Sequence, residues 1–289
     1  MLKTTNVAIV TDTTACILPE QVEKYGIKVV PVDLIFKDRV YRDRIDINPS
    51  EFYQLLKKAE KLPTTSGSLP EPYLEAFKEA SRYTSNILCI CLSAKLSAMF
   101  NSALLAKEML KGSRPDMNVE VLDCGTAAAG QGLVVLAAAA KATSGGDLEG
   151  VIAATRGVMT KVKIFAALDT LYYLVKGGRV PKAAALVNSV LKIKPVFTIE
   201  DGEAHTVALP RTTRSALKQV LKLMKRNLGK GAKPHVAVMH ADSRDTALLL
   251  GEQISAQFDC AELFITEFTP VMGVHTGPGL IGIAFYSDE

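Results

Sequence analysis

Residues 86–110 read NILCICLSAKLSAMFNSALLAKEML and place an apolar strand directly before a helix. The first eight residues form a short apolar run, which is typical of a strand buried on both faces. The residues after it lead into a helix. A strand that runs into a helix is the repeating unit of parallel α/β sheets, so this stretch predicts an α/β fold.

The rest of the first half alternates in the same way. A helix is expected to begin after Asn48, because Asn48 suits the N-cap, Pro49 the first helical position and Glu51 the third. The other predicted strands are 6–14, 27–36 and 119–125, and the other predicted helices are 127–142 and 148–160. We therefore predict an N-terminal α/β domain, residues 1–160, with a βαβ-type parallel sheet.

The second half, residues 161–289, has a different pattern and predicts a mixed α+β domain. Residues 194–209, KPVFTIEDGEAHTVAL, predict two strands joined at Asp201-Gly202, a strong hairpin signal. The other predicted strands are 163–169, 235–242, 261–268 and 280–286, and the predicted helices are 184–191, 212–228 and 246–258. The expected architecture is two α/β domains with a ligand between them.

The composition excludes several classes of protein. With 48% hydrophobic and 22% charged residues the chain is predicted to fold in water, and no apolar run is long enough to span a bilayer. Asp12 interrupts the N-terminus too early for a signal peptide, so a cytoplasmic location is expected. The five cysteines are predicted to be reduced thiols, and no cluster has the spacing of metal ligands. GxSxG and GxxxxGK[ST] motifs are absent.

The positive charges are unevenly distributed. No acidic residue lies between Glu203 and Asp242, and that interval has eight basic residues: Arg211, Arg214, Lys218, Lys222, Lys225, Arg226, Lys230 and Lys233. An ordinary solvated helix face, an acidic protein partner and a transient contact with an anionic membrane all fit this pattern. Nucleic-acid binding is not predicted, because no aromatic residues interleave the charges.

Three short segments concentrate hydroxyl groups and one histidine near predicted strand ends. They are LPTTSGSLP (62–70), CLSAKLSAMFNS (91–102) and PVMGVHTGPG (270–279), and their candidate ligand-binding residues are Thr64, Thr65, Ser66, Ser93, Ser97 and His275. Each residue alone is an ordinary cap or loop residue. Ligands bind outside the carboxyl ends of strands in open α/β sheets, and hydroxyls beside a helix N-terminus suit an oxyanion. No acid accompanies them in these segments, which favours binding over catalysis.

The whole chain resembles the DegV family of bacterial fatty-acid-binding proteins. The motifs that carry the resemblance are VAIVTDTTACILPE, GIKVVPV, PTTS, LSAKLS, LDTLYYLVKGGRV with KAAALVNSVLKIKP, and GVHTGPGLIGIAF, in this order. The resemblance implies two α/β domains that hold one long-chain fatty acid, for example palmitate. It also implies a non-catalytic acyl-carrier subunit, without a cofactor, that presents the carboxylate to a separate fatty acid kinase.

The resemblance also assigns roles to residues. Thr65, Ser97 and His275 would contact the fatty-acid carboxylate, with Thr64, Ser66 and Ser93 as near neighbours. Arg179, Arg211 and Arg214 would face the kinase. No metal ligand and no catalytic residue is implied.

A carrier of this kind needs an apolar tunnel and a polar end. Burial of each CH₂ group of an acyl chain stabilises the complex by about 0.8 kcal/mol. Hydroxyl or histidine donors can hold a carboxylate without a guanidinium or a metal. Gly273 and Gly277 are expected to let the backbone approach the ligand. Two alternatives remain: a small-molecule phosphotransferase or hydrolase with His275 as base or covalent site, and a regulatory protein whose partner binds the basic stretch.

Overall fold

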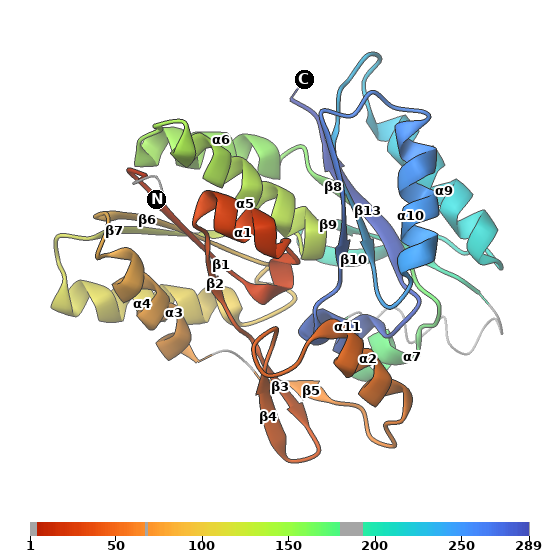
Figure 1. Ribbon diagram of the computed structural model, residues 1–289, viewed down its shortest axis with the longest axis horizontal. Coiled ribbons are helices and arrows are strands. Elements are labelled where there is room, and N and C mark those ends of the chain that lie inside the picture. Colours follow the sequence, from red (N-terminus) through yellow and green to blue (C-terminus); the bar gives the residue numbers. More distant parts are fainter. Residues whose placement is uncertain (1–4, 67–68, 180–192, 289) are drawn as a thin grey trace.

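The chain forms two lobes, each built around a β-sheet (Figure 1). The computed structural model describes residues 5–66, 69–179 and 193–288. The first lobe contains a four-stranded parallel sheet in the order β2-β1-β6-β7. Its strands are β1 (Ala8–Asp12), β2 (Lys28–Val30), β6 (Asn86–Cys91) and β7 (Asn118–Asp123).

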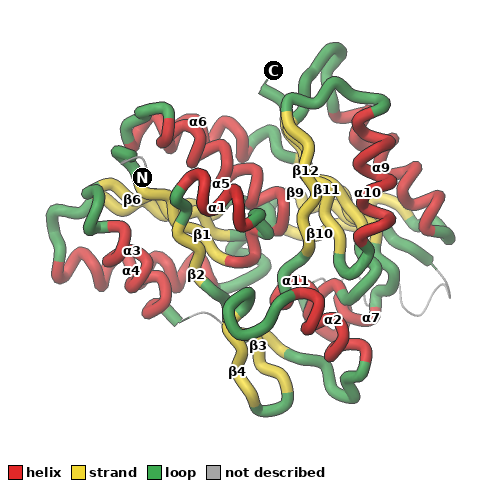
Figure 2. The backbone as a smooth tube through the Cα atoms, viewed as in Figure 1, coloured by secondary structure: helices red, strands yellow, loops and turns green. Residues whose placement is uncertain are grey.

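Helices cover both faces of the parallel sheet, as Figure 2 shows. One face packs against α3 (Pro70–Ala80) and α4 (Met99–Ser113), and the other against α5 (Ala128–Thr143). The helices α1 (Pro19–Tyr25) and α6 (Leu148–Met159) lie beside α5. Five of the six residues of β6 are buried, which confirms the prediction of a strand enclosed on both faces.

One predicted strand is divided in two. Residues 27–36 were expected to form a single strand, but β2 ends at Val30 and β3 (Asp33–Phe36) starts a new sheet. Pro31 separates them, because proline has no N–H with which to continue the ladder. β3 pairs instead with β4 (Arg39–Arg42) and β5 (Thr64–Thr65), forming a three-stranded sheet at the base of the molecule in Figure 1.

The predicted start of the next helix is confirmed. Helix α2 (Pro49–Lys57) begins after Asn48, whose side chain accepts a hydrogen bond of 2.9 Å from the Glu51 N–H. The Glu51 carboxylate accepts in return from the Asn48 N–H at 3.2 Å, which completes a capping box.

The second lobe contains a mixed six-stranded sheet in the order β10-β9-β8-β13-β11-β12. Among the described strands of this sheet, β11 and β12 form the one parallel pair and all other pairs are antiparallel. The expected α+β character is therefore confirmed. Asp201 and Gly202, with φ of 49° and 76°, form the predicted two-residue turn. The strands are β8 (Lys163–Ala167), β9 (Val196–Glu200), β10 (Glu203–Ala208), β11 (His235–His240), β12 (Glu262–Glu267) and β13 (Ile281–Tyr286).

Helices α9 (Thr213–Asn227) and α10 (Arg244–Ser255) cover the outer face of this sheet. Both were predicted, with ends that differ by a few residues. The helix predicted over residues 184–191 lies outside the described residues. No helix in the described ranges is long and apolar enough to cross a bilayer.

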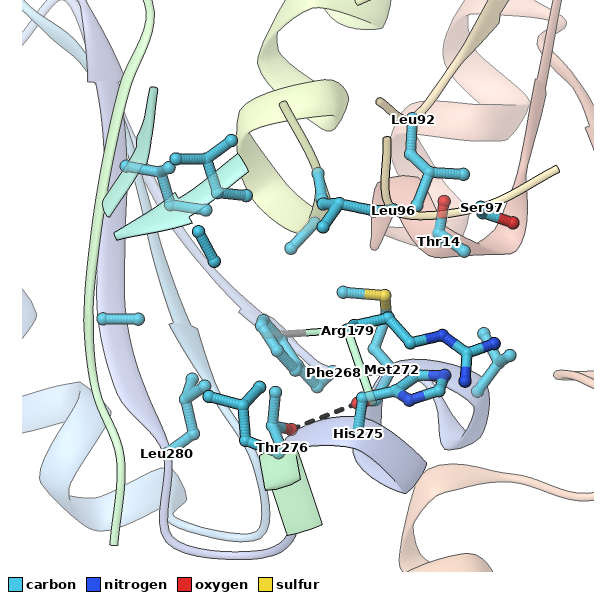
Figure 3. Close-up of a pocket in the computed structure, with 18 of the residues that line it drawn as sticks. Thr14, Leu92, Leu96, Ser97, Arg179, Phe268, Met272, His275, Thr276 and Leu280 are labelled. Atoms are coloured by element: carbon cyan, nitrogen blue, oxygen red, sulfur yellow. Dashed lines mark hydrogen bonds between the residues drawn. The ribbon is translucent and has the colours of Figure 1, made fainter. Parts of the chain in front are cut away.

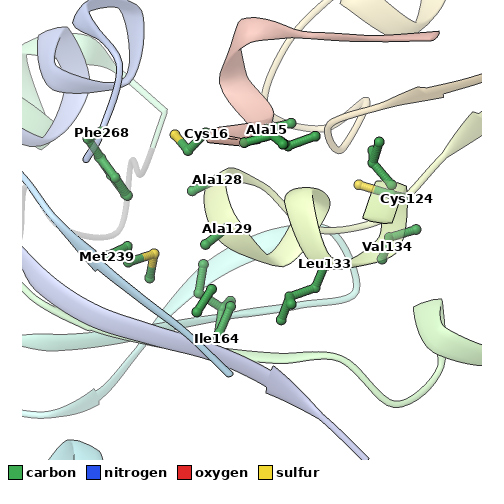
Figure 4. Close-up of a cluster of buried hydrophobic side chains, with 14 of the residues drawn as sticks. Ala15, Cys16, Cys124, Ala128, Ala129, Leu133, Val134, Ile164, Met239 and Phe268 are labelled. Carbon is green, nitrogen blue, oxygen red and sulfur yellow. The ribbon is translucent and has the colours of Figure 1, made fainter. Parts of the chain in front are cut away.

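Helix α5 lies between the two sheets and contacts both. It is apolar nearly all round, as a helix enclosed on all sides should be. Ala128, Ala129 and Leu133 point from α5 into the apolar cluster in Figure 4, which also holds Cys16 and Ile164. The largest apolar core is therefore continuous between the lobes. The boundary predicted at residue 160 falls between α6 and β8 and remains a prediction.

Candidate ligand-binding site

A cavity of about 160 Å³ lies between the two lobes. Most of its wall is apolar, and the polar side chains Thr14, Ser97, Arg179 and His275 gather on one side of it in Figure 3. The lining residues used below are Thr14, Val32, Thr65, Ser66, Ser97, Met99, Ala127, Ala166, Arg179, Phe197, Met239, Met272, His275 and Thr276.

The first lobe contributes the loops that follow all four strands of its parallel sheet. Val32 follows β2, Thr14 follows β1, Ser97 follows β6 and Ala127 follows β7. Parallel strands end at the same edge of a sheet, so these four loops meet there. The cavity thus lies where the strand-end rule places a ligand.

The second lobe contributes the floor of the cavity. Ala166 of β8, Phe197 of β9 and Met239 of β11 face it from the mixed sheet. Ala166 pairs with Phe197 on one side and with Gly282 on the other. Small side chains at this point of the sheet leave the space that the cavity occupies.

Thr65 and His275 meet at the polar side of the cavity although they are 210 residues apart in sequence. The Thr65 Oγ1 atom is 3.3 Å from the His275 Nε2 atom. Thr65 is held by the pairing of β5 with β3, and His275 by the short helix α11 (Pro270–Thr276). The structure therefore brings together two of the three residues assigned to the carboxylate, and Ser97 lines the same cavity.

Residues 270–276, expected to be a glycine-rich loop, form helix α11. Its N-cap is Thr269, and it ends at Gly277 with φ of 68°. A Cβ atom on Gly273 would lie 2.6 Å from the Phe52 ring, and one on Gly277 would collide with the Tyr173 ring. These glycines therefore let α11 pack against α2 and α7 (Tyr172–Gly177), and not against a ligand as predicted.

His275 is neutral at physiological pH. Burial of the imidazole, and secondarily the nearby charge of Arg179, lowers the pKa of His275 to about 4. Its buried Nδ1 atom has no hydrogen-bond partner among the described residues. A buried N–H without an acceptor is costly, so the hydrogen belongs on Nε2, where Thr65 Oγ1 accepts it. The Thr65 hydroxyl hydrogen is then free for a ligand.

We expect the His275 imidazole to titrate with a midpoint of about 4, because protonation would bury a charge beside Arg179. Ring-nitrogen NMR between pH 3 and pH 8 measures this midpoint, and a His275→Gln variant identifies the signal. The ordinary pKa of histidine is 6.5, and the folded protein lowers it to about 4. The free energy of unfolding should therefore decrease as the pH falls from 6.5 towards 4, because the unfolded chain binds a proton that the folded protein does not. A midpoint near 6.5 would show that the ring is solvated.

The remaining predicted contacts divide into two groups. Ser66 lines the cavity as expected, but Thr64 and Ser93 do not. Thr64 is exposed, since neighbouring residues of a strand point to opposite faces. Ser93 is buried, and its hydroxyl donates to the Gly202 carbonyl at 2.8 Å, which ties the end of β6 to the β9–β10 turn. In the structure Ser93 thus joins the two lobes.

Of the three arginines assigned to a partner, only Arg179 reaches the cavity. Its side chain lines the cavity beside His275 while remaining exposed to solvent. Arg211 and Arg214 are exposed at the start of α9 and do not line it. The cavity wall therefore includes one guanidinium, that of Arg179, beside His275.

Sequence reasoning missed Thr14 and Thr276 as lining residues. The rule that selected Ser97, a hydroxyl just after a predicted strand, also applies to Thr14 after β1, so this signal was available. Thr276 donates to the Met272 carbonyl at 3.1 Å, an ordinary bond within α11. No local pattern distinguishes it from a solvated loop threonine.

All five cysteines lie in the described part of the chain and are free thiols. Cys16, Cys89, Cys91 and Cys124 are buried. Among residues 5–66, 69–179 and 193–288 no group of three or more His, Cys, Asp or Glu residues could hold a metal ion.

Fold and cavity together define a two-lobed α/β protein with a largely apolar cavity between the lobes that is polar on one side. A family model described as uncharacterised proteins of the DegV family matches residues 6–288. The chain belongs to the DegV family.

Relatives and solved structures resemble the chain over almost its whole length. A DegV domain-containing protein from Halalkalibacterium halodurans is 32% identical over 288 residues, which is 99% of this chain and 100% of the relative. A fatty-acid-binding DegV family protein from Thermus thermophilus has a TM-score of 0.90 at 28% identity, covering 98% of this chain and 99% of that one. A stearic-acid-binding protein from Eubacterium ventriosum has a TM-score of 0.90 at 26% identity, covering 97% and 98%.

Proposed function

We propose that the chain binds one long-chain fatty acid in the cavity and presents its carboxylate to a separate fatty acid kinase. The observation that carries this proposal is the combination of a largely apolar cavity between the lobes with the Thr65–His275 pair at its wall. The fatty-acid-binding structures from Thermus thermophilus and Eubacterium ventriosum support it.

The apolar wall supplies the driving force. About fourteen buried CH₂ groups gain roughly 11 kcal/mol before the costs of association and ordering are subtracted. At about 160 Å³ the cavity is close in size to one of about 150 Å³ that binds benzene. Part of a long acyl chain therefore fits without rearrangement, and the rest requires side chains to move. Met99, Met239 and Met272 are suited to this, because the unbranched thioether has many accessible rotamers.

The polar side supplies the contacts for the head group. The free hydrogen of Thr65 and the hydroxyls of Ser66 and Ser97 can all donate to a carboxylate, while the His275 N–H donates to Thr65 Oγ1 and orients it. Arg179 adds a positive charge at the solvent-exposed margin, where it is screened. Thr64 and Ser93 have no part in this set.

The proposed role requires no chemistry from the chain itself. A kinase has to reach the carboxylate from outside, and Arg179 is both exposed and in the cavity wall. We therefore retain Arg179 in the kinase-facing surface, together with the exposed Arg211 and Arg214. A cytoplasmic location, where ATP is available, is part of the proposal. A transient contact of the basic helix α9 with an anionic membrane also remains proposed.

Loss of the Thr65 hydroxyl is expected to weaken palmitate binding by about 10- to 100-fold. Hydrogen bonds to charged groups contribute about 1.5–3 kcal/mol, and Thr65→Val removes this donor while keeping the side chain's shape. The matched control is Thr64→Val, one residue away and outside the cavity, which is expected to bind like the wild type. Titration calorimetry with palmitate measures both. Equal affinities for the two variants would contradict the assignment.

Mass spectrometry of the protein purified under native conditions tests the function itself. A co-purified fatty acid is the expected result, and acyl phosphate should form when a fatty acid kinase and ATP are added. A protein that carries no lipid and does not bind added palmitate has a different function.

A further inference from the structure

A buried polar network reaches the cavity at Thr14. Thr14 belongs to the short 3₁₀ helix (Thr13–Ala15) that follows β1, and it lines the cavity on the same side as Ser97 in Figure 3. Behind it lie Asp12 of β1 and Gln131 of α5, both of which are fully buried. Neither was a candidate for the carboxylate site.

The hydroxyl of Thr14 has one hydrogen but two acceptor neighbours. Its Oγ1 atom lies in hydrogen-bond contact with Asp12 Oδ1 and is 2.8 Å from Gln131 Oε1. A hydroxyl donates one hydrogen bond, and an ionised carboxylate donates none. If Asp12 is ionised, one of these two oxygen–oxygen contacts has no hydrogen in it.

Reversing the Gln131 amide does not remove this conflict. Its Nε2 atom lies 3.4 Å from the Ile90 carbonyl oxygen and 3.3 Å from Asp12 Oδ2. The hydroxyl hydrogen of Thr11 is already donated to the same Ile90 carbonyl at 2.8 Å. A reversed amide would place its oxygen against these two oxygens and against Thr11 Oγ1, which lies 3.1 Å from Nε2. The observed orientation is therefore the one that the surroundings require.

With a proton on Asp12 Oδ1, each of these contacts contains a hydrogen, and the remaining lone pair of Oδ1 accepts from the Thr14 N–H at 2.9 Å. Asp12 then donates to Thr14, and Thr14 donates to Gln131. Asp12 Oδ2 accepts from the Tyr73 hydroxyl at 3.1 Å and from Gln131 Nε2. Burial acts in the same direction, because it raises the pKa of Asp12 from 3.8 to about 6, although hydrogen bonds from Thr14 lower it.

The titratable groups around Asp12 do not compensate a negative charge. In the described chain they are a phenol and four thiols, none of them a cation: Tyr73, Cys16, Cys89, Cys91 and Cys124. An ionised Asp12 would therefore be a buried anion in direct contact with Thr14, which lines the cavity. A ligand carboxylate in the cavity would add a second anion in a region of low dielectric constant, where like charges repel strongly.

We propose that Asp12 is a positioning residue that holds a proton when a carboxylate ligand occupies the cavity, so that Thr14, backed by Gln131, presents an uncharged wall to the head group. This rests on the proposed function, since it takes the ligand to be a fatty-acid anion. Binding of the anion is then linked to uptake of a proton by Asp12.

Calorimetry with dodecanoate and 1-dodecanol tests the proposal. These probes have the same chain length and differ in charge, so only the binding of dodecanoate is expected to be linked to proton uptake by Asp12. In the wild type its affinity is expected to fall above pH 6, by up to about tenfold per pH unit, the limit for one proton. Asp12→Asn cannot titrate, so its affinity for dodecanoate should be nearly constant between pH 6 and pH 8. Any protonation of dodecanoate itself is common to both proteins.

A second measurement needs no variant. Titrations of the wild type at pH 7, in two buffers with different protonation enthalpies, report the number of protons taken up per ligand bound. We expect a value between zero and one for dodecanoate and zero for 1-dodecanol. Zero for both, or the same pH profile for Asp12→Asn and the wild type, overturns the proposal.

Failure of the proposed function gives a different result. If neither probe binds, the chain is not a fatty-acid carrier, and carboxyl ¹³C NMR of the ligand-free protein then decides whether Asp12 holds a proton. A midpoint near pH 6 supports the protonated network. A midpoint near the ordinary value of 3.8 overturns it.

Discussion

Ala166→Phe is expected to lower the affinity for palmitate by about three to four orders of magnitude without unfolding the protein. Ala166 is only partly buried because it forms part of the cavity floor. It lies between Phe197 and Gly282 on the neighbouring strands. The substitution adds a phenyl ring to the wall of a cavity of about 160 Å³. Displacing about six CH₂ groups of the ligand costs roughly 5 kcal/mol.

The measurement is titration of palmitate by calorimetry or fluorescence displacement, with thermal unfolding to confirm the fold. The matched control is Ala256→Phe, at an exposed alanine after α10, which is expected to bind palmitate like the wild type. A shorter acid such as octanoate should lose less affinity in Ala166→Phe, because less of its chain reaches the floor. If palmitate binds Ala166→Phe as well as it binds the wild type, the acyl chain lies elsewhere.

The free energy of unfolding of Asp43→Asn, measured relative to the wild type, is expected to rise by about 3 kcal/mol between pH 4 and pH 8. Asp43 is fully buried, and neither carboxyl oxygen has a partner at hydrogen-bond geometry in the part of the chain that the structure describes. Burial raises the pKa of Asp43 from 3.8 to about 6, although the nearby hydroxyls of Thr13 and Thr269 lower it. The folded protein therefore keeps a proton that the unfolded chain has already released.

The sign follows from that difference in proton binding. The contribution of Asp43 to stability is complete below about pH 3.8 and is lost as the pH rises through about 6. An asparagine side chain has no proton to lose, so the Asp43→Asn variant should gain stability relative to the wild type as the pH increases. Urea unfolding at pH 4, 6 and 8 gives the difference in the free energy of unfolding.

Asp46→Asn is the matched control in the same turn, between β4 and α2. Hydrogen bonds from Arg42 lower the pKa of Asp46 to about 2, so its titration lies below this pH range. Its effect on stability should therefore be constant from pH 4 to pH 8. Parallel pH profiles for Asp43→Asn and the wild type would show that Asp43 ionises as it does in water.

Much of the fold could be predicted because its signals are local. The apolar run of β6 indicated a strand enclosed on both faces, and the Asn48–Glu51 capping box located the start of α2. The Asp201-Gly202 turn predicted the hairpin in the second lobe. The predictions failed where a short element depends on its neighbours. Pro31 ends β2 early, and α11 is a helix because its glycines pack against the aromatic rings of α2 and α7.

The site was predicted less completely. Hydroxyls after predicted strands identified Ser97, and the same rule applied to β1 would have found Thr14. It could not separate Thr65 from Thr64, because the face of a two-residue strand is set by its pairing with β3. The rule also could not show that the Ser93 hydroxyl donates its hydrogen bond to the Gly202 carbonyl of the other lobe.

By itself the sequence determined the alternation of strands and helices, the parallel first sheet and the set of polar residues from which the site is built. These depend on side-chain periodicity, capping and turn residues within a few positions of one another. Only the tertiary structure decided which of those residues share the cavity, that His275 is neutral, and that Asp12 and Gln131 lie behind Thr14. The contacts of Thr14 with Gln131 and of Thr65 with His275 join residues more than a hundred positions apart. Burial, which no local pattern encodes, sets the charge of Asp12 and His275.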